Sequence, residues 1–199
     1  AQIGAWNFAR LLDSIAPLME EPERLHEALE FYFEAYKEHN GRMWAGKLGL
    51  EGFNAGDEGL VTELTSILQR VETDMTIFFR MLSTIRRPDV DHLRFAFYNE
   101  DAIPEDEWND WLGKWWDRVN EKPDQEKMRS SNPKYVLRNW MAQLAIDAAE
   151  KEDYSVAIEL YELLKRPYDE QTEFESRWFN KRPEWARHRV GCSMLSCSS

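Results

Sequence analysis

Cysteine is nearly absent from this sequence. The chain has 199 residues and two cysteines, Cys192 and Cys197, which both lie among the last eight residues. Two cysteines so close together cannot form the disulfide framework of a small secreted domain, so we expect a reducing compartment. Because the chain starts at Ala1 and enters a helical pattern almost at once, we expect it to be a piece of a longer polypeptide.

Long apolar runs are absent as well. No run approaches the ~18 apolar residues that a membrane span needs. Arg10 and Asp13 interrupt the apolar stretch that a signal peptide would require near the N-terminus. We therefore expect no membrane segment and no membrane partner.

Basic residues are too few for a protein that binds nucleic acid. Lysine and arginine total 25 against 37 aspartates and glutamates, which gives a formal net charge of -12. A protein that grips a phosphate backbone needs a basic face, so we expect no nucleic-acid partner. The hydrophobic fraction of 43%, with nine Trp and ten Phe, is typical of a folded globular chain.

Strand-like alternation is nearly absent, and apolar residues recur instead at helical spacing. We predict an all-α fold with about seven helices. The clearest pattern follows Pro104 and an acidic first turn, where Trp108, Trp111 and Trp115 form a stripe that we assign to the core. The predicted helices are one near the N-terminus and six over residues 25–36, 60–71, 75–82, 104–119, 133–148 and 157–164.

The dipeptide Asn132-Pro133 predicts the start of the helix over residues 133–148. Asparagine is a favoured N-cap, and proline at the first helical position has no N–H group to leave unsatisfied. Trp140 belongs to the predicted buried stripe of this helix. We expect a second, polar stripe to face solvent, and it consists of Asn139, Gln143 and Asp147.

Two stretches break the helical pattern. Residues 46–59 hold five glycines and are predicted to form a flexible connector, with a helix N-cap at Asn54 or Asp57. A phosphate-binding loop is excluded there, because no strand precedes it, no Lys-Ser/Thr pair closes it and its acidic residues would repel phosphate. Residues 86–103 form the second break.

The tail from residue 181 to residue 199 carries the sharpest chemical signal. Cys197 is third from the end of this predicted flexible tail and has no core to pack into, whereas free cysteine is usually buried. We predict that Cys197 and Cys192 are redox-active, with Cys197 the more exposed and the more reactive, because cations earlier in the tail favour the thiolate. A Cys192–Cys197 disulfide and two inert thiols are the alternatives. The cations are Arg182, Arg187, His188 and Arg189.

Metal ligands are sparse. Three of the four histidines stand alone, without other ligands beside them. His188, Cys192 and Cys197 are three possible zinc ligands, but without a second His/Cys pair the pattern does not predict a metal site.

The motif Asn132-Pro-Lys-Tyr-Val-Leu-Arg-Asn139 resembles a segment of the selenoprotein O family, the pseudokinase-like protein adenylyltransferases. Four further segments match landmarks of that family in the right order, and the last places Cys197 where some members carry selenocysteine. Cys192 departs from the closer Cys-x-x-Sec spacing of those members. The four segments are Trp6-Asn7 with Ala9-Arg10-Leu11, Lys47-Leu-Gly-Leu50, Arg166-Pro-Tyr-Asp-Glu170 and Ser196-Cys197-Ser-Ser199.

The resemblance implies that residues 1–180 are a helical C-terminal extension that packs on a kinase-like C-lobe. The full-length protein would use ATP and Mg²⁺ to transfer AMP to Ser, Thr or Tyr hydroxyls of protein substrates. The family's nucleotide-binding, metal-binding and catalytic residues precede the matched segments, so the resemblance implies none of them in this stretch, which should be inactive alone. It also implies a cytoplasmic protein if the source is bacterial and a mitochondrial one if it is eukaryotic.

A second reading comes from the residues alone. Residues 142–164 look like a helical-repeat hairpin. The alternative function is therefore a free-standing α-helical protein-interaction module.

Overall fold

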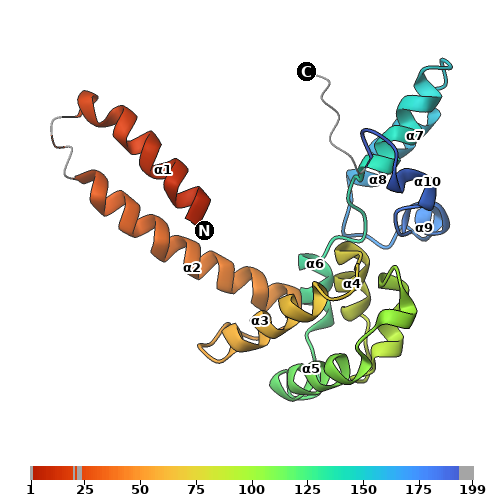
Figure 1. Ribbon diagram of the computed structural model, residues 1–199, viewed down its shortest axis with the longest axis horizontal. Coiled ribbons are helices and arrows are strands. Elements are labelled where there is room, and N and C mark those ends of the chain that lie inside the picture. The colour runs from red at the N-terminus through yellow and green to blue at the C-terminus, as the bar shows by residue number, and fades with distance from the viewer. Residues whose placement is uncertain (1, 20, 22–23, 193–199) are drawn as a thin grey trace.

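The structure is a computed structural model that describes residues 2–19, 21 and 24–192, and in these residues it is all-α, as predicted (Figure 1). An isolated antiparallel bridge pairs Thr73 with Phe97. The helices are α1 (Gln2–Ile15), α2 (Arg24–Leu48), α3 (Asp57–Leu68), α4 (Met75–Leu82), α5 (Glu105–Arg118), α6 (Gln125–Ser131), α7 (Asn139–Ala149), α8 (Ser155–Leu164), α9 (Thr172–Trp178) and α10 (Glu184–Arg187), with 3-10 segments η1 (Ala16–Leu18), η2 (Val90–Ala96) and η3 (Glu100–Ala102).

Seven of the ten α-helices in the described residues correspond to the predicted ones. The other three, α6, α9 and α10, have seven, seven and four residues. Helices this short offer too few apolar positions for a helical period to stand out in the sequence.

That the chain extends a kinase-like lobe stays a prediction.

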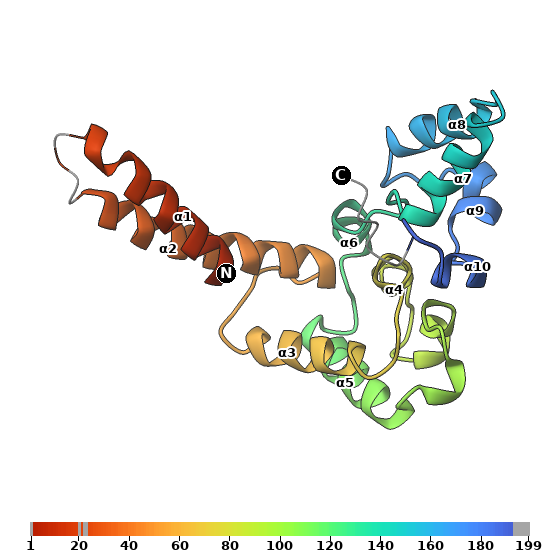
Figure 2. The same cartoon turned by 45° about the horizontal axis from the view of Figure 1, so that its top comes forward.

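Figures 1 and 2 show two arms joined by a base. The helices α1 and α2 form a hairpin that projects on one side, and α7 to α10 form the opposite arm. The base is built from α3 to α6, where α2 packs on α6 and α3 packs on α5. Within the described ranges, none of the helices has the length and apolar character to cross a membrane.

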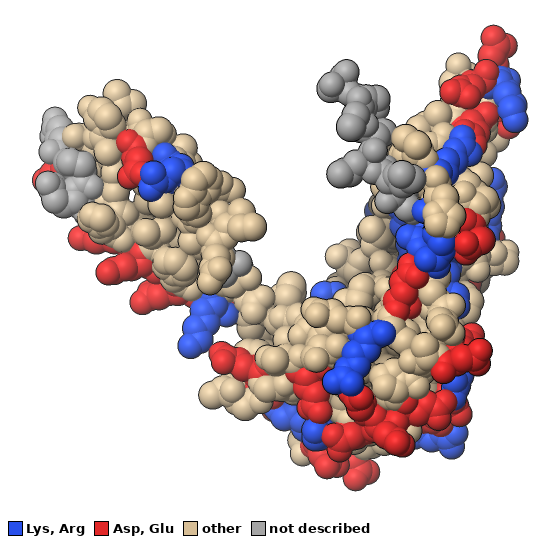
Figure 3. All heavy atoms as spheres, in the orientation of Figure 1, with Lys and Arg blue, Asp and Glu red and all other residues tan. Residues whose placement is uncertain are grey.

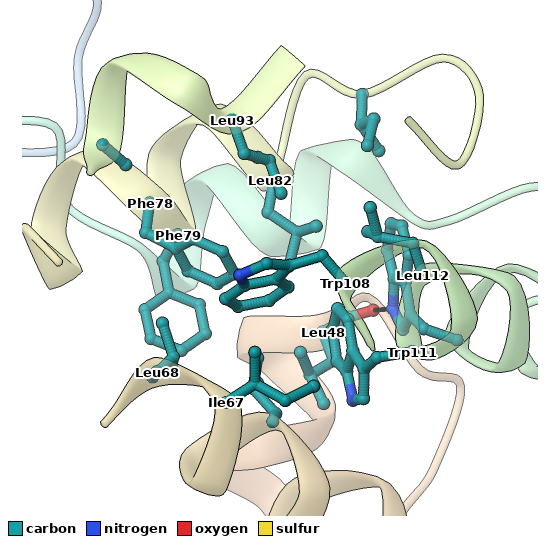
Figure 4. Close-up of a cluster of buried hydrophobic side chains, with 14 of the residues drawn as sticks. Leu48, Ile67, Leu68, Phe78, Phe79, Leu82, Leu93, Trp108, Trp111 and Leu112 are labelled. Carbon is teal, nitrogen blue, oxygen red and sulfur yellow. Dashed lines mark hydrogen bonds between the residues drawn. The ribbon is translucent and has the colours of Figure 1, made fainter. Parts of the chain in front are cut away.

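The larger hydrophobic core, which we call the first core, is centred on the tryptophan stripe of α5 (Figure 4). Trp108, Trp111 and Trp115 are fully buried, which confirms their predicted place in the core. Trp111 Nε1 donates to Leu60 O and Trp115 Nε1 donates to Leu48 O, both at 2.9 Å, so α5 is tied to α3 and to the end of α2. At ~25 cal/mol per Å² and roughly 150–250 Å² per ring, burial of each tryptophan stabilises the fold by up to about 4–6 kcal/mol.

The second core lies in the other arm, where α7 and α8 pack against each other and against α9. The ring centroids of Trp140 and Trp178 are 5.9 Å apart. As predicted, α8 ends before Pro167. The buried members of the second core are Tyr135, Trp140, Met141, Leu160, Leu163, Trp178, Ala186 and Cys192.

The helix start predicted at Asn132-Pro133 is wrong. Asn132 is the C-cap of α6, and α7 begins at Asn139. Proline disfavours the α conformation in the residue before it, and Asn132 is accordingly extended, with φ -116° and ψ 99°. The chain after it does not resume a helix before Asn139, and the N–H groups of Lys134 and Tyr135 both donate to Pro167 O, at 2.8 and 3.1 Å.

The glycine-rich connector is shorter than predicted, because α2 continues through Gly46 to Leu48. A β-carbon at Gly46 would lie 2.5 Å from Ser131 Oγ, so glycine permits the close approach of α2 and α6. The helix ends at Leu48, and the next residue, Gly49, has a φ of +67° that favours glycine. Leu50 N–H donates to Ala45 O at 2.9 Å, which is the six-to-one bond of a Schellman helix end.

The N-cap predicted at Asn54 or Asp57 is also wrong. The N-cap of α3 is Gly56, and Asp57 is the first residue of the helix. The Asp57 carboxylate turns inward instead, where it accepts from Asn54 N–H at 2.7 Å and from Arg118 Nε at 2.6 Å. The Asp57 side chain therefore forms a long-range ion pair with Arg118 instead of the N-cap hydrogen bond that the local sequence predicts.

Candidate functional site

Two of the sequence motifs meet in a polar contact between α2 and the chain after α6. Asn132 Nδ2 donates to Lys47 O at 2.9 Å and to Ser83 Oγ at 3.4 Å, and Lys47 Nζ donates to Asn132 Oδ1 at 3.1 Å. Asn132 is 1% exposed, so these groups satisfy one another in place of water. We call the set formed by Lys47, Arg80, Asn132, Lys134 and Glu170 the junction.

Arg80 enters the junction from α4. Its side chain is 4% exposed, and its Nη1 donates to Arg129 O and Asn132 O, both at 3.2 Å. Its Nη2 pairs with Glu170, which ends a third family motif, Arg166-Pro-Tyr-Asp-Glu170. Sequence reasoning missed Arg80, although a cation inside an apolar helical run is a signal that the charge is buried with partners.

Lys134 and Glu170 close the junction on the side of the second core. Lys134 is 4% exposed, and its Nζ donates to Glu170 Oε2 at 2.9 Å and to Glu175 Oε2 at 2.8 Å. Burial alone would lower the pKa of Lys134, but the hydrogen bonds to the two glutamates outweigh it and raise that pKa. For Glu170 the directions are reversed: burial acts to raise its pKa, but Lys134 and Arg80 together outweigh burial and hold the pKa of Glu170 below its ordinary value. Both partners therefore stay charged at neutral pH.

Lys47 has a different environment from the other junction cations. Its Nζ bonds to the neutral amide of Asn132 and lies 4.2 Å from the centre of the Phe79 ring. Burial lowers the pKa of Lys47, because the charged form loses water. The ring face of Phe79 offsets part of this loss through a cation–π contact.

A second link runs from the Asn132–Asn139 motif to α4. Arg138 Nη2 donates to Asp74 Oδ1 at 2.8 Å, and Nη1 pairs with the other oxygen of the same carboxylate. Asp74 Oδ1 also accepts from Ile77 N–H at 3.1 Å as the N-cap of α4. One carboxylate therefore caps a helix of the first core and anchors the segment that leads into the second core.

The chemistry of the junction is that of a structural joint. Its cations point at carboxylates, carbonyl groups or a ring of the same chain, so they are engaged before any ligand arrives. The three motifs that carry it come from α2, from the chain between α6 and α7, and from the chain between α8 and α9. They hold the first core and the second core in one arrangement.

Cys192 lies in the second core and is 7% exposed, whereas the prediction placed it in a flexible tail. The segment from residue 181 through Cys192 is packed: Lys181 Nζ donates to Phe97 O at 2.6 Å and Arg182 N–H donates to Tyr98 Oη at 2.8 Å. Cys197, with the rest of residues 193–199, lies outside the described residues.

The three arginines among the cations that we expected to favour a thiolate have other partners. Arg182 and Arg187 both pair with Glu72, at 2.6 and 3.0 Å. Arg189 Nη1 and Nη2 donate to Asp147 at 2.8 and 2.7 Å. The polar stripe of α7 faces solvent at Asn139, as expected, but it also holds the C-terminal segment: Asn139 Nδ2 donates to Cys192 O at 3.3 Å.

No group of three or more His, Cys, Asp or Glu side chains placed to hold a metal ion occurs in the described residues. A groove of about 1030 Å³ lies between α2 and residues 51–62, with Trp44, Phe53 and Val61 among its lining. Its glutamates would repel the phosphates of a nucleotide. The charged residues that line it are Glu34, Lys37, Glu38, Arg42, Glu51, Glu58 and Lys127.

Comparison with known proteins bears on the motifs. The family described as protein adenylyltransferase SelO matches residues 1–165. Over 211 aligned residues the chain is 46% identical to a protein nucleotidyltransferase YdiU of Flavobacterium johnsoniae, over 206 it is 45% identical to that of Aromatoleum aromaticum, and over 222 it is 43% identical to that of Rhodopirellula baltica. The alignments cover 100%, 99% and 100% of this chain, and 40%, 39% and 41% of the relatives.

The chain therefore spans about two fifths of the length of the curated relatives it matches. The match includes the Lys47 and Asn132 motifs, whose side chains meet in the junction. The resemblance predicted from those motifs is confirmed, and the chain belongs to the SelO family of protein adenylyltransferases.

Proposed function

We propose that this chain is the helical C-terminal part of an enzyme that transfers AMP from ATP to Ser, Thr or Tyr hydroxyls of protein substrates, with Mg²⁺. The proposal rests on the family and on the share of the relatives that the chain spans. The relatives named above are bacterial, and we place the protein in the cytoplasm.

The observation that carries the role of this chain is the junction. Its motif side chains bind one another, so they hold the two cores together and do not face a nucleotide. The described residues do not fit a magnesium–nucleotide complex, because they lack a cluster of metal ligands and because the junction cations are already paired. Stabilising charge at the α-phosphate of ATP during AMP transfer is then the task of the part of the enzyme that the chain does not span.

The test compares this chain with the full-length protein, each incubated with labelled ATP, Mg²⁺ and a protein acceptor. We expect label on the acceptor with the full-length protein and none with this chain, and no ATP binding to this chain in calorimetry. Asn132→Ala in the full-length protein should lower stability while leaving the turnover of the folded fraction unchanged. Specific ATP binding by this chain, or no transfer by the full-length protein, would contradict the proposal.

We extend the proposal to the C-terminal cysteine. Four residues separate Cys197 from the buried Cys192, and the five residue steps between the two span at most ~17 Å, so Cys197 can reach groups near the second core. On oxidation, Cys197 and a cysteine of the active-site part would lose two protons and two electrons to a peroxide or a disulfide, and the new bond would change activity. Cys197→Ser should abolish both the bond and the redox response, whereas Cys192→Ser should leave both intact.

A second candidate function is the free-standing interaction module. The hairpin of α7 and α8 exposes apolar side chains at its surface, which favours a protein contact there. The reading frame around this chain separates the two functions, since a continuous frame that supplies the remaining length of the relatives favours the enzyme. The exposed residues are Ile146, Tyr154, Ile158 and Tyr161, at 51%, 59%, 61% and 65%.

A further inference from the structure

The groove of about 1030 Å³ between α2 and residues 51–62 has an apolar floor. Trp44, Phe53 and Val61 form this floor, and all three are partly buried against the first core. The ring of Trp44 packs on that of Phe79, with centroids 6.1 Å apart. Since ligand pockets of proteins measure about 300–1,000 Å³, the groove is large enough to take a few side chains of a partner.

The walls of the groove are held in place by contacts within the chain. Lys127 Nζ donates to Leu50 O at 2.7 Å, where the chain leaves α2 and turns into the wall. On α2, a β-carbon at Gly41 would lie 3.1 Å from the ring of Phe53, so glycine lets this ring pack directly against the helix. The groove is therefore formed before a ligand arrives, which lowers the entropy lost on binding.

The charges along the groove are unbalanced. Glu38 and Arg42 pair with each other, and the ammonium of Lys127 donates to backbone carbonyl groups. Three exposed carboxylates and one exposed ammonium of the lining remain without an ion pair among the described residues. These four side chains belong to Glu34, Glu51, Glu58 and Lys37. The groove thus presents an excess of negative charge around an apolar floor.

We propose that this groove binds a cationic segment of the protein substrate, in which one or two apolar side chains stand between lysines or arginines. The apolar side chains lie on the floor, and the flanking cations pair with the unpaired glutamates. In Figure 3, acidic side chains follow the underside of α2 as well, and their field draws a cationic segment toward this helix. The inference rests on the proposed function, because it names the kind of substrate that the enzyme holds.

Three synthetic peptides test the inference by calorimetry with the full-length protein. The first, Arg-Lys-Leu-Phe-Arg-Lys, carries both features of the proposed ligand. The second replaces Leu-Phe by Gly-Ser, and the third replaces the four cations by glutamate. At about 0.15 M salt, where charges more than ~8 Å from the groove are screened, we expect the first peptide to bind at least about tenfold more tightly than the other two.

Two calorimetric results would overturn the inference. Equal binding of the first two peptides would show only the general attraction of an acidic chain for cations. No binding of the first peptide would show that the groove is closed to it, whether by the rest of the enzyme or by a second copy.

Glu58 and Glu173 supply a matched pair of variants, because both are exposed and lie in the first turn of a helix. Glu58 lines the groove, whereas Glu173 belongs to α9 in the opposite arm (Figure 1). We expect Glu58→Lys to weaken binding of the first peptide by about fivefold or more and Glu173→Lys to leave it unchanged. Equal effects of the two variants would contradict the inference.

A cross-linking measurement on the unsubstituted protein remains decisive if Glu58→Lys prevents folding. The phenylalanine of the first peptide is replaced by benzoylphenylalanine, and the photoproduct is mapped by mass spectrometry. The label should fall on α2 or on residues 51–62. A label confined to other elements would refute the inference.

Transfer of AMP to an acceptor that carries the first peptide as a tag separates this inference from the proposed function. We expect the tag to lower KM at an unchanged kcat, since it adds binding that is the same in the ground state and the transition state. Glu58→Lys should remove this gain. Transfer that ignores the tag would refute the inference alone, and peptide binding without any transfer would refute the proposed function alone.

Discussion

Asn132 satisfies three polar groups with one side-chain amide, and none of the three has an easy substitute. Asn132→Ala would leave Lys47 O, Lys47 Nζ and Ser83 Oγ without this partner in a site that is 1% exposed. We expect the free energy of unfolding to fall by about 1–3 kcal/mol in urea titrations. Asn139→Ala is the control, since Asn139 is exposed and makes one 3.3 Å bond, and should cost less than about 0.5 kcal/mol. Equal losses would show that the amide network contributes nothing.

Asp57 makes stability depend on acid. Burial acts to raise the pKa of Asp57, but the hydrogen bonds from Arg118 and from Asn54 N–H outweigh it and hold the pKa below its ordinary value. A carboxyl with a depressed pKa stabilises the fold above its unfolded pKa of ~3.9, and this contribution is lost as the pH falls through the folded value. We expect Asp57→Asn to reduce the slope of unfolding free energy against pH below about pH 4. Asp110→Asn, at an exposed ion pair, should keep the slope of the parent chain.

At the scale of elements, the segment that ends at Cys192 is held on α7 by a small number of bonds. Arg189 donates twice to Asp147, at 2.7 and 2.8 Å, and Asn139 donates to Cys192 O. A partly exposed ion pair is worth up to about 1 kcal/mol, so Arg189→Ala should raise the rate at which Cys192 reacts with a maleimide by up to about fivefold. Cys197→Ser in every sample isolates the signal of Cys192.

The matching control at this scale is Arg166→Ala, because Arg166 pairs with Asp169 on the exposed surface at 3.4 Å. It should leave the maleimide rate unchanged. A rate that rises equally in both variants would mean that the Arg189–Asp147 pair does not hold the segment.

At the scale of the whole molecule, Arg80 couples the two cores. It reaches from α4 to Asn132 O and to Glu170, and Arg80→Met would leave Arg129 O and the buried Asn132 O without this donor, at a cost of roughly 1–3 kcal/mol. We expect unfolding of the parent chain to give one transition by tryptophan fluorescence and by circular dichroism. In Arg80→Met the transition followed by tryptophan fluorescence and the one followed by circular dichroism should no longer coincide. Arg70→Ala, which removes an exposed ion pair to Glu107, should keep them coincident.

Features that depend on residues close together in the sequence could be predicted, and features that depend on distant residues could not. Helical spacing of apolar residues by itself determined the all-α class and the tryptophan core, because burial of one helix face imposes a repeat that is visible locally. The motifs by themselves determined the family. Arg80 was missed, although a charge inside the apolar sequence of α4 is a signal of burial, and its partners lie in distant segments.

Tertiary structure alone decided what Asn132 and Cys192 do. A residue before proline is extended both at a helix start and at a helix end, so the local sequence is compatible with either role for Asn132. Its place at the end of α6 is decided by hydrogen bonds to Lys47 and Ser83, which are 85 and 49 residues away. Cys192 is buried because α7 offers Asn139 and Asp147 to the segment that carries it. Polar partners depend on which distant segments meet, and a periodic pattern carries information about one helix face at a time.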